Sequence, residues 1–131
     1  MAIHHIQIWV PDLARAERSW GWLLDELGFT LSRTWEHGRV WRKDGTGIAI
    51  EQSPDMVPGM LYSRLRPGLN HIAFQVASAD ELARVVSAAA PYGWTPLDGG
   101  RHPFPPGTTT AFVEDVDGFE VELVAPEAGP A

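Results

Sequence analysis

Apolar and polar residues alternate in two segments of the chain, one near its start and one near its middle. In residues 3–10 the aliphatic side chains take every second position, and His5 falls on the opposite side. Residues 70–77 repeat this alternation, and there His71 falls opposite the apolar side chains. A period of two predicts strands that have one apolar face and one mixed face.

Apolar residues at helical spacing follow each of these strands. Residues 13–27 form the first predicted helix, for which Asp12 provides a cap and Gly28 a stop signal. Its apolar positions are Leu13, Ala16, Trp20, Leu23, Leu24 and Leu27. Residues 80–90 form the second predicted helix, whose apolar positions are Leu82, Val85, Val86 and Ala89.

Three shorter segments with strand and turn patterns follow each helix. They are residues 29–36, 38–43 and 47–52 in the first half, and 94–98, 109–114 and 118–124 in the second. The halves 3–52 and 68–124 therefore both follow the order β-α-β-β-β, and residues 53–67, rich in proline and glycine, connect them. We expect a single domain over residues 1–131, of the α+β class. In it, two paired βαβββ modules form a curved mixed sheet with the helices on its convex face.

The two halves share a motif as well as an element order. Each half begins a strand with a histidine, His5 or His71, and ends with the pattern Asp-x-x-Gly-x-x-x-Glu, which closes at Glu51 or Glu122. Strand alternation turns all four side chains away from the aliphatic face that covers the helix. We therefore expect the four to face one cleft on the concave side of the sheet, supplied by rigid strands.

Two imidazoles and two carboxylates are a ligand set that suits divalent Ni, Co, Zn, Fe or Mn. Such a site keeps positions for water or for two neighbouring substrate oxygens, where the ion acts as a Lewis acid. A glutamate that leaves the ion could also move a proton. Glu120 shares the strand face of Glu122, and we expect it to be a solvated carboxylate.

Composition excludes several other classes of protein. The formal net charge of −7 disfavours nucleic acid as a partner. The absence of cysteine excludes disulfides and thiolate metal sites. The first ten residues do not resemble a signal peptide, and no window is apolar for the about 18 residues of a membrane span, so we expect a cytoplasmic protein without a membrane partner.

The duplicated β-α-β-β-β order and the His, Glu, His, Glu set resemble the vicinal oxygen chelate superfamily. This group includes glyoxalase I, bleomycin-resistance proteins, extradiol dioxygenases, methylmalonyl-CoA epimerase and fosfomycin-resistance enzymes. The resemblance covers residues 3–124, and residues 109–123 are similar to the last strands of glyoxalase I. Asn70-His71-Ile72 and Leu27-Gly28-Phe29 also fit the superfamily pattern.

The resemblance implies that one divalent metal ion is held by His5, Glu51, His71 and Glu122. It implies that Glu122 or Glu51 is also the catalytic base that transfers a proton. It favours a metal-dependent lyase or isomerase of the glyoxalase type, which acts on a small substrate with adjacent oxygens through an enediolate. It also implies a homodimer, with modules that pair either within one chain or between chains.

The sequence departs from glyoxalase I where that enzyme holds glutathione. Trp9 and Asp55 occupy the positions of a basic residue on the first strand and of an asparagine after the first glutamate. A flat or apolar ligand is therefore expected in place of glutathione. The residues expected to contact it are Trp9, Gln7, Trp35, Trp41 and Gln75.

The sequence is also compatible with two other functions. Aromatic walls are typical of bleomycin-resistance proteins, which sequester an antibiotic and commonly bind it without a metal. A ring-cleaving dioxygenase is a weaker alternative, because that chemistry favours two histidines and one carboxylate around Fe(II), and Glu51 would be an extra ligand.

Overall fold

The structure is a computed structural model that describes residues 2–97 and 108–126. The chain divides into two compact units between Leu61 and Tyr62, within the connector predicted for residues 53–67. Among the described residues, no helix is long and apolar enough to cross a membrane.

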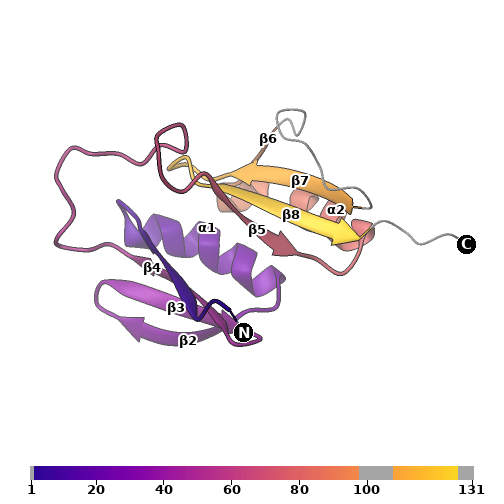
Figure 1. The fold of residues 1–131 in the computed structure, drawn as a ribbon, viewed down its shortest axis with the longest axis horizontal. Coiled ribbons are helices and arrows are strands. Elements are labelled where there is room, and N and C mark those ends of the chain that lie inside the picture. The colour runs from indigo at the N-terminus through magenta and orange to yellow at the C-terminus, as the bar shows by residue number, and fades with distance from the viewer. Residues whose placement is uncertain (1, 98–107, 127–131) are drawn as a thin grey trace, which may run out of the picture. The chain divides into compact units, whose positions relative to one another are not determined.

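The first unit has the predicted β-α-β-β-β order (Figure 1). Its elements are β1 (His5–Trp9), α1 (Leu13–Glu26), β2 (Thr30–Trp35), β3 (Gly38–Lys43) and β4 (Thr46–Glu51). The strands form a four-stranded sheet in the order β1-β4-β3-β2. β1 is parallel to β4, and the β4–β3 and β3–β2 pairs are antiparallel, so the sheet is mixed.

Helix α1 begins at the predicted cap and covers one face of this sheet. The side chain of Asp12 accepts a hydrogen bond of 2.9 Å from the backbone N–H of Arg15, which satisfies one of the unpaired donors of the first turn. Trp20, Leu23 and Leu24 are almost fully buried on the side of α1 that faces the sheet. Helix α1 contacts β3 and β4, and the aliphatic residues Ile48 and Ile50 of β4 are buried, as the alternation predicts.

Trp41 belongs to this apolar layer, and its predicted contact with ligand is wrong. Its register partner is Ile48, and the side chain is only 3% exposed. A Cβ placed on Gly21 of α1 would lie 3.2 Å from Cζ2 of the Trp41 ring, so the indole packs directly against the helix. The physical reason is the pleat, because odd and even positions of β3 face opposite sides of the sheet.

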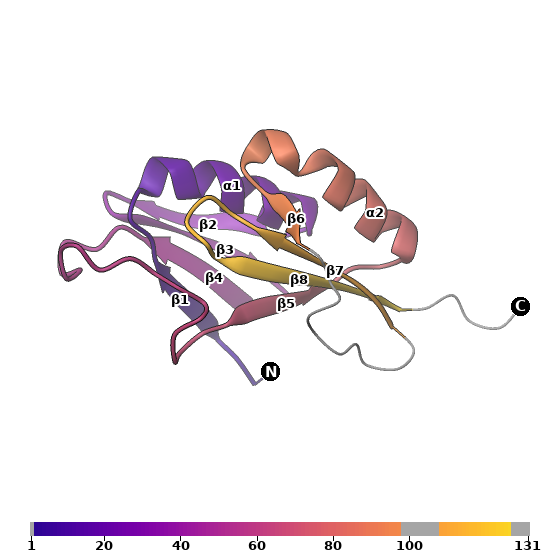
Figure 2. The same ribbon diagram turned by 90° about the horizontal axis from the view of Figure 1, so that it is seen from above.

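The second unit repeats the order and adds a short 3-10 helix. Its elements are β5 (His71–Gln75), α2 (Ala79–Ala88), η1 (Ala90–Tyr92), β6 (Thr95–Leu97), β7 (Thr108–Glu114) and β8 (Glu120–Pro126). The sheet has the order β5-β8-β7-β6, with β5 parallel to β8. Ser78 caps α2 by accepting a hydrogen bond from the backbone N–H of Glu81, and Leu82 and Val85 are buried where α2 packs on β7 and β8 (Figure 2).

The α+β class and the two βαβββ modules are therefore confirmed, as two four-stranded mixed sheets that each carry one main helix. Most observed element bounds lie within one or two residues of the predicted ones. We expect the functional residues on the face of each sheet that is turned away from its helix.

Candidate functional site

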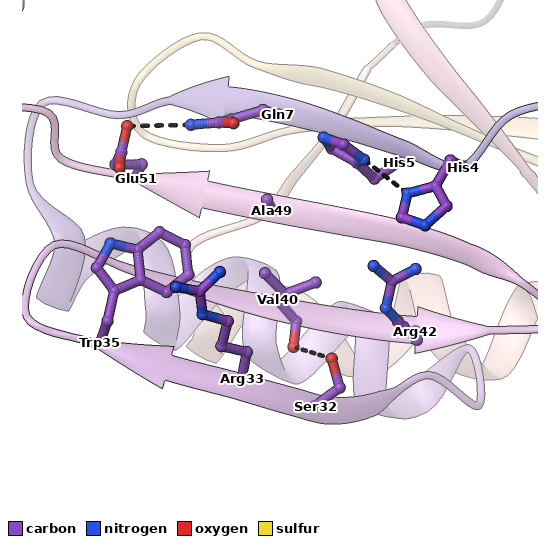
Figure 3. Close-up of a pocket in the computed structure, with 10 residues that line it drawn as sticks. All are labelled: His4, His5, Gln7, Ser32, Arg33, Trp35, Val40, Arg42, Ala49 and Glu51. Atoms are coloured by element: carbon purple, nitrogen blue, oxygen red, sulfur yellow. Dashed lines mark hydrogen bonds between the residues drawn. The ribbon is translucent and has the colours of Figure 1, made fainter.

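The first unit carries a pocket of about 730 Å³ on the face of its sheet that is turned away from α1 (Figure 3). Strand register explains its composition, because Gln7 pairs with Ala49, and small residues leave space above the centre of the sheet. The residues that line it come from β1, β2, β3 and β4, with one from the segment before β1: His4, His5, Gln7, Ser32, Arg33, Trp35, Val40, Arg42, Ala49 and Glu51.

His5 and Glu51 both line this pocket but have different partners. Gln7 Nε2 donates a hydrogen bond of 3.0 Å to Glu51 Oε1. The Nδ1 atoms of His4 and His5 lie 2.8 Å apart, with one ring donating to the other. Figure 3 shows the two histidines at one end of the pocket and the Gln7–Glu51 pair at the other.

Two glycines shape the rest of the pocket. A Cβ on Gly38 would collide with the Trp35 ring and would lie 2.5 Å from the carbonyl oxygen of Ile50, so the indole lies over bare backbone. A Cβ on Gly47 would lie 3.1 Å from Arg42 Nη1 and 3.1 Å from the Cβ of His5. The absence of a side chain at Gly47 therefore makes room for the Arg42 guanidinium beside His5.

The second unit brings its predicted histidine and glutamate into direct contact. His71 Nε2 lies 3.1 Å from Glu122 Oε1, and His71 Nδ1 lies 2.6 Å from Asn70 Oδ1. An amide oxygen only accepts hydrogen bonds, so Nδ1–H is the donor to Asn70. The edge of the His71 ring also contacts Phe112, with ring centroids 5.8 Å apart, which holds the plane of the imidazole.

This arrangement fits a divalent cation. With Nδ1 protonated, a neutral His71 presents its Nε2 lone pair to a carboxylate oxygen, so a cation between the two atoms would stabilise them. Nitrogen and oxygen ligands lie about 2.1 Å from a divalent ion of this size. Two adjacent ligands of an octahedral ion meet at a right angle and are therefore about 3 Å apart. The observed separation meets this condition. Within the part of the chain that the structure describes, no group of three or more potential ligands lies close enough together to hold a metal.

The amide of Asn70 is itself held in place by Arg64. Asn70 Nδ2 donates to the backbone carbonyl of Arg64 at 3.1 Å, which orients Oδ1 toward His71. The Arg64 side chain is anchored by Glu114 Oε1 at 2.7 Å and by Glu120 Oε2 at 3.6 Å. The hydrogen bond from Arg64 to Glu114 raises the pKa of the guanidinium further above its usual value.

Glu120 corrects a second expectation. It shares the face of Glu122, as predicted, but it is buried, with only 1% of its side chain exposed. It is the register partner of His71 and lies beneath the Arg64 guanidinium. A buried carboxylate needs a nearby positive charge, and Arg64, from the segment before β5, supplies it.

The two halves differ in register at their glutamates. His71 pairs with Glu120, and Glu122 lies two positions further along β8. His5 pairs with Gly47, so the equivalent position on β4 is Ala49. Glu51 lies two residues beyond Ala49, where it pairs with Trp9. The motif that ends at Glu51 thus matches the second half in sequence spacing but not in strand register.

Of the residues predicted to contact the ligand, some line the first-unit pocket and others lie outside it. Gln7 and Trp35 line the pocket of the first unit. Trp9 is 46% exposed and lies next to Glu51 in register, outside the pocket lining. Gln75 is exposed near the end of β5 in the second unit.

Sequence reasoning gave no role to Asn70, Arg33 or Arg42. The position of Asn70 directly before a strand histidine is a usable signal, because a short amide there can reach the ring. Arg33 and Arg42 could have been placed by counting alternate positions from Trp35 and from Gly38.

A model of the glyoxalase/bleomycin resistance protein/dioxygenase superfamily matches residues 4–112 of the chain. The chain belongs to this superfamily. The match covers the strands that carry His5, Glu51 and His71, and it confirms the resemblance to the vicinal oxygen chelate proteins.

Full-length relatives agree with this assignment. The uncharacterized protein YqjT of Bacillus subtilis (strain 168) is 38% identical over 126 residues, which are 95% of this chain and 98% of YqjT. The crystal structure of a "putative glyoxalase" from Bacillus halodurans is similar with a TM-score of 0.85 and 33% identity, over 95% of this chain and 96% of that one.

A more distant solved structure shows the same fold. The fosfomycin resistance protein FosX from Listeria monocytogenes matches with a TM-score of 0.67 and 21% identity, over 95% of this chain and 93% of that one. At this identity the likeness concerns the fold alone.

Proposed function

We propose that this chain is a metal-dependent enzyme of the glyoxalase type, a lyase or isomerase that moves a proton on a small substrate with adjacent oxygens. The observation that carries the proposal is the His71–Glu122 pair, in which a nitrogen and an oxygen ligand are 3.1 Å apart and the imidazole is oriented by Asn70. Superfamily membership supports it, because a metal held by strand histidines and glutamates is the pattern that the sequence resembles.

The proposed ligand set is His5, Glu51, His71 and Glu122, for one divalent ion such as Ni, Co, Zn, Fe or Mn. A bound ion would polarise adjacent substrate oxygens and stabilise negative charge that develops on them. Glu122 or Glu51 would accept the proton from substrate carbon, since a carboxylate base needs to be within reach of the reacting atom. Asn70 would keep the ligand His71 oriented toward the ion.

Metal content is the direct test. Protein purified without chelator or metal-affinity tag should contain about one divalent ion per ligand set, measured by elemental analysis. His71→Ala should lower the metal content sharply, because the ring that faces Glu122 is lost. His37→Ala is the matched control, since His37 lies in the turn between β2 and β3 and outside the proposed set. Equal metal content in wild type, His71→Ala and His37→Ala would refute the proposal.

Activity is the second test. Glu122→Gln should abolish turnover of hemithioacetal or α-hydroxycarbonyl substrates, because the amide is a poor base and a poor ligand. Metal-loaded protein that binds aromatic compounds tightly but converts none of these substrates would instead support an antibiotic-sequestering protein.

The register difference favours one second candidate, a ring-cleaving dioxygenase. If Ala49 takes the place equivalent to Glu122, the set reduces to His5, His71 and Glu122, which is the two-histidine, one-carboxylate pattern of Fe(II) oxygenases. Glu51→Gln separates the two candidates. Loss of metal and of proton transfer supports the four-ligand enzyme, whereas retention of iron together with cleavage of a catechol supports the dioxygenase.

A further inference from the structure

Arg33 and Arg42 line the pocket of the first unit, and they differ in their ion pairing from four other arginines of the chain. Arg15, Arg39, Arg64 and Arg84 each pair with a carboxylate of the same unit. Within residues 2–97 and 108–126, neither Arg33 nor Arg42 forms an ion pair, although the protein as a whole carries a formal net charge of −7. Two unneutralised cations in one pocket of an acidic protein are a specific feature of this site.

The pocket's own carboxylate does not neutralise them. Glu51 accepts the hydrogen bond from Gln7 and lies at the end of the pocket opposite His4 and His5 (Figure 3). Arg42 lies toward the histidine end. The basic side of the pocket is therefore made by Arg42, His4 and His5, with Arg33 beside it on β2.

Both guanidinium groups are positioned by neighbouring groups that leave their N–H donors available. The Arg33 guanidinium lies over the Trp35 ring, 4.9 Å from the ring centroid, which is a cation–π contact. Trp35 is in turn seated over Gly38, where a Cβ would collide with the indole. Arg42 lies in the space that Gly47 leaves beside His5. Stacking and packing hold these groups without using their hydrogen-bonding capacity.

We propose that this pocket binds an organic anion, and that Arg42 and Arg33 hold the carboxylate of a small organic acid. A planar guanidinium matches a carboxylate in shape and offers paired N–H donors, so charge-assisted hydrogen bonds form there. The acid is the substrate only if the proposed function holds, and this one statement rests on it. The substrate class is then an acid with adjacent oxygens. Arg42 and Arg33 select anionic over neutral compounds.

The test uses metal-stripped protein, so that the anion site is measured apart from any ion. Benzoate and benzamide are the probes, since they share a flat ring and differ in charge, and tryptophan fluorescence reports binding. Benzoate should bind at least about tenfold more tightly than benzamide, and its affinity should fall as salt is added. Arg42→Gln and Arg33→Gln should each weaken benzoate binding by about tenfold and leave benzamide binding unchanged.

Arg84→Gln is the matched control, because Arg84 is an exposed arginine of α2 paired with Glu81. The thermal melt of Arg42→Gln should match wild type, because no ion pair among the described residues is lost. Arg33→Gln should melt only slightly lower, because it loses the cation–π contact with Trp35 and no such ion pair. Equal binding of benzoate and benzamide, or equal loss in Arg42→Gln and Arg84→Gln, would overturn the proposal.

Failure of the anion site and failure of the metal proposal give different results. Arg42→Gln should keep the metal content of wild type. His71→Ala should lose metal while its stripped form still binds benzoate with wild-type affinity. Loss of benzoate selectivity with metal retained refutes only the anion site, and absence of metal with selectivity retained refutes only the metal enzyme.

Discussion

At the scale of single residues, the candidate site depends on how one imidazole is oriented. His71 Nδ1 is engaged by Asn70 Oδ1, so the opposite nitrogen is the one turned toward Glu122. The partner of one ring nitrogen thereby selects the nitrogen that can bind a cation. In the first unit, the ring of His5 instead contacts the ring of His4, so a neighbouring histidine orients it.

Asn70→Ala should weaken divalent metal binding by about 10- to 100-fold, because the ring then loses the acceptor that fixes its tautomer. Competition with a chromophoric chelator measures this affinity. Asn70→Asp keeps an oxygen near Nδ1 and should retain most of the affinity. Equal affinities of Asn70→Ala and wild type would show that His71 is oriented by other contacts.

Tyr62 gives a prediction about pH. Burial, assisted by nearby Glu120 and Asp115 and opposed by Arg64, raises the pKa of Tyr62 above its usual 10.0. The Tyr62 hydroxyl also donates a hydrogen bond of 2.6 Å to the Leu69 carbonyl, and its ring stacks on Phe119. The folded state therefore holds the phenolic proton more tightly than the unfolded chain does. The resulting stability is fully present below pH 10.0 and is lost as pH rises through the folded pKa.

Phenolate absorbance and denaturant unfolding at alkaline pH check this. Tyr62→Phe should remove a tyrosine titration that lies above pH 10.0, and its stability should decline less between neutral pH and about pH 11. Tyr92→Phe is the control, since Tyr92 is the other tyrosine of the chain. An unchanged titration curve in Tyr62→Phe would contradict the assignment.

At the scale of elements, each sheet separates an apolar face that packs on a helix from a polar face that carries the candidate site residues. In the first unit, Leu24 of α1 and Ile50 of β4 are fully buried on one side. Gln7 and Glu51 meet on the other. Burial of these apolar side chains against the helix favours the strand orientation in which the polar positions face the pocket.

Leu24→Ala should lower the free energy of unfolding by about 2–5 kcal/mol, because it leaves a cavity between α1 and the sheet. Leu31→Ala on β2 is the matched control, since Leu31 is 46% exposed and its loss should cost about 0.5 kcal/mol or less. Urea denaturation followed by circular dichroism measures both values. Similar destabilisation of the two variants would contradict the observed position of α1.

Sequence periodicity was sufficient for the elements but not for register. The facing of His5 and Gln7 on one side of β1 was predicted correctly, because a period of two fixes side-chain direction. Trp41 was misplaced because it was grouped with Trp35 by residue type, whereas the pleat puts it against α1. The position of Glu51 opposite Trp9 depends on how β1 aligns with β4, and residues distant in sequence decide that alignment.

At the scale of the whole molecule, the duplicated unit explains why the two halves are alike and where they have diverged. Both units have the same strand order and a histidine at the start of the first strand. The first unit has a pocket with two arginines, and the second has a histidine–glutamate pair supported by Arg64 and Asn70. The repeated motifs predicted the duplication. The contacts were needed to show that a pair of arginines lines the pocket of the first unit, whereas the second unit pairs a histidine with a glutamate.

Residues 57–69, which lie between β4 and β5, carry the exposed apolar side chains from which we predict that the homodimer forms. The large apolar side chains of this segment are between 44% and 84% exposed: Val57, Met60, Leu61, Leu65 and Leu69. Exposed apolar side chains concentrated in one segment mark an interaction surface, and a second copy of the same chain is the commonest partner. We expect light scattering after size-exclusion chromatography to give twice the chain mass of 14.4 kDa.

The double variant Leu61→Asp and Leu65→Asp should be monomeric at the same concentration, because each aspartate would place a charge in the apolar interface. Val116→Asp is the control, since Val116 is 63% exposed in the turn between β7 and β8, outside the connector. It should remain a dimer. Circular dichroism of the double variant should match wild type, since neither side chain is buried within its unit. A monomeric wild type, or a double variant that stays dimeric, would show that the connector does not mediate assembly.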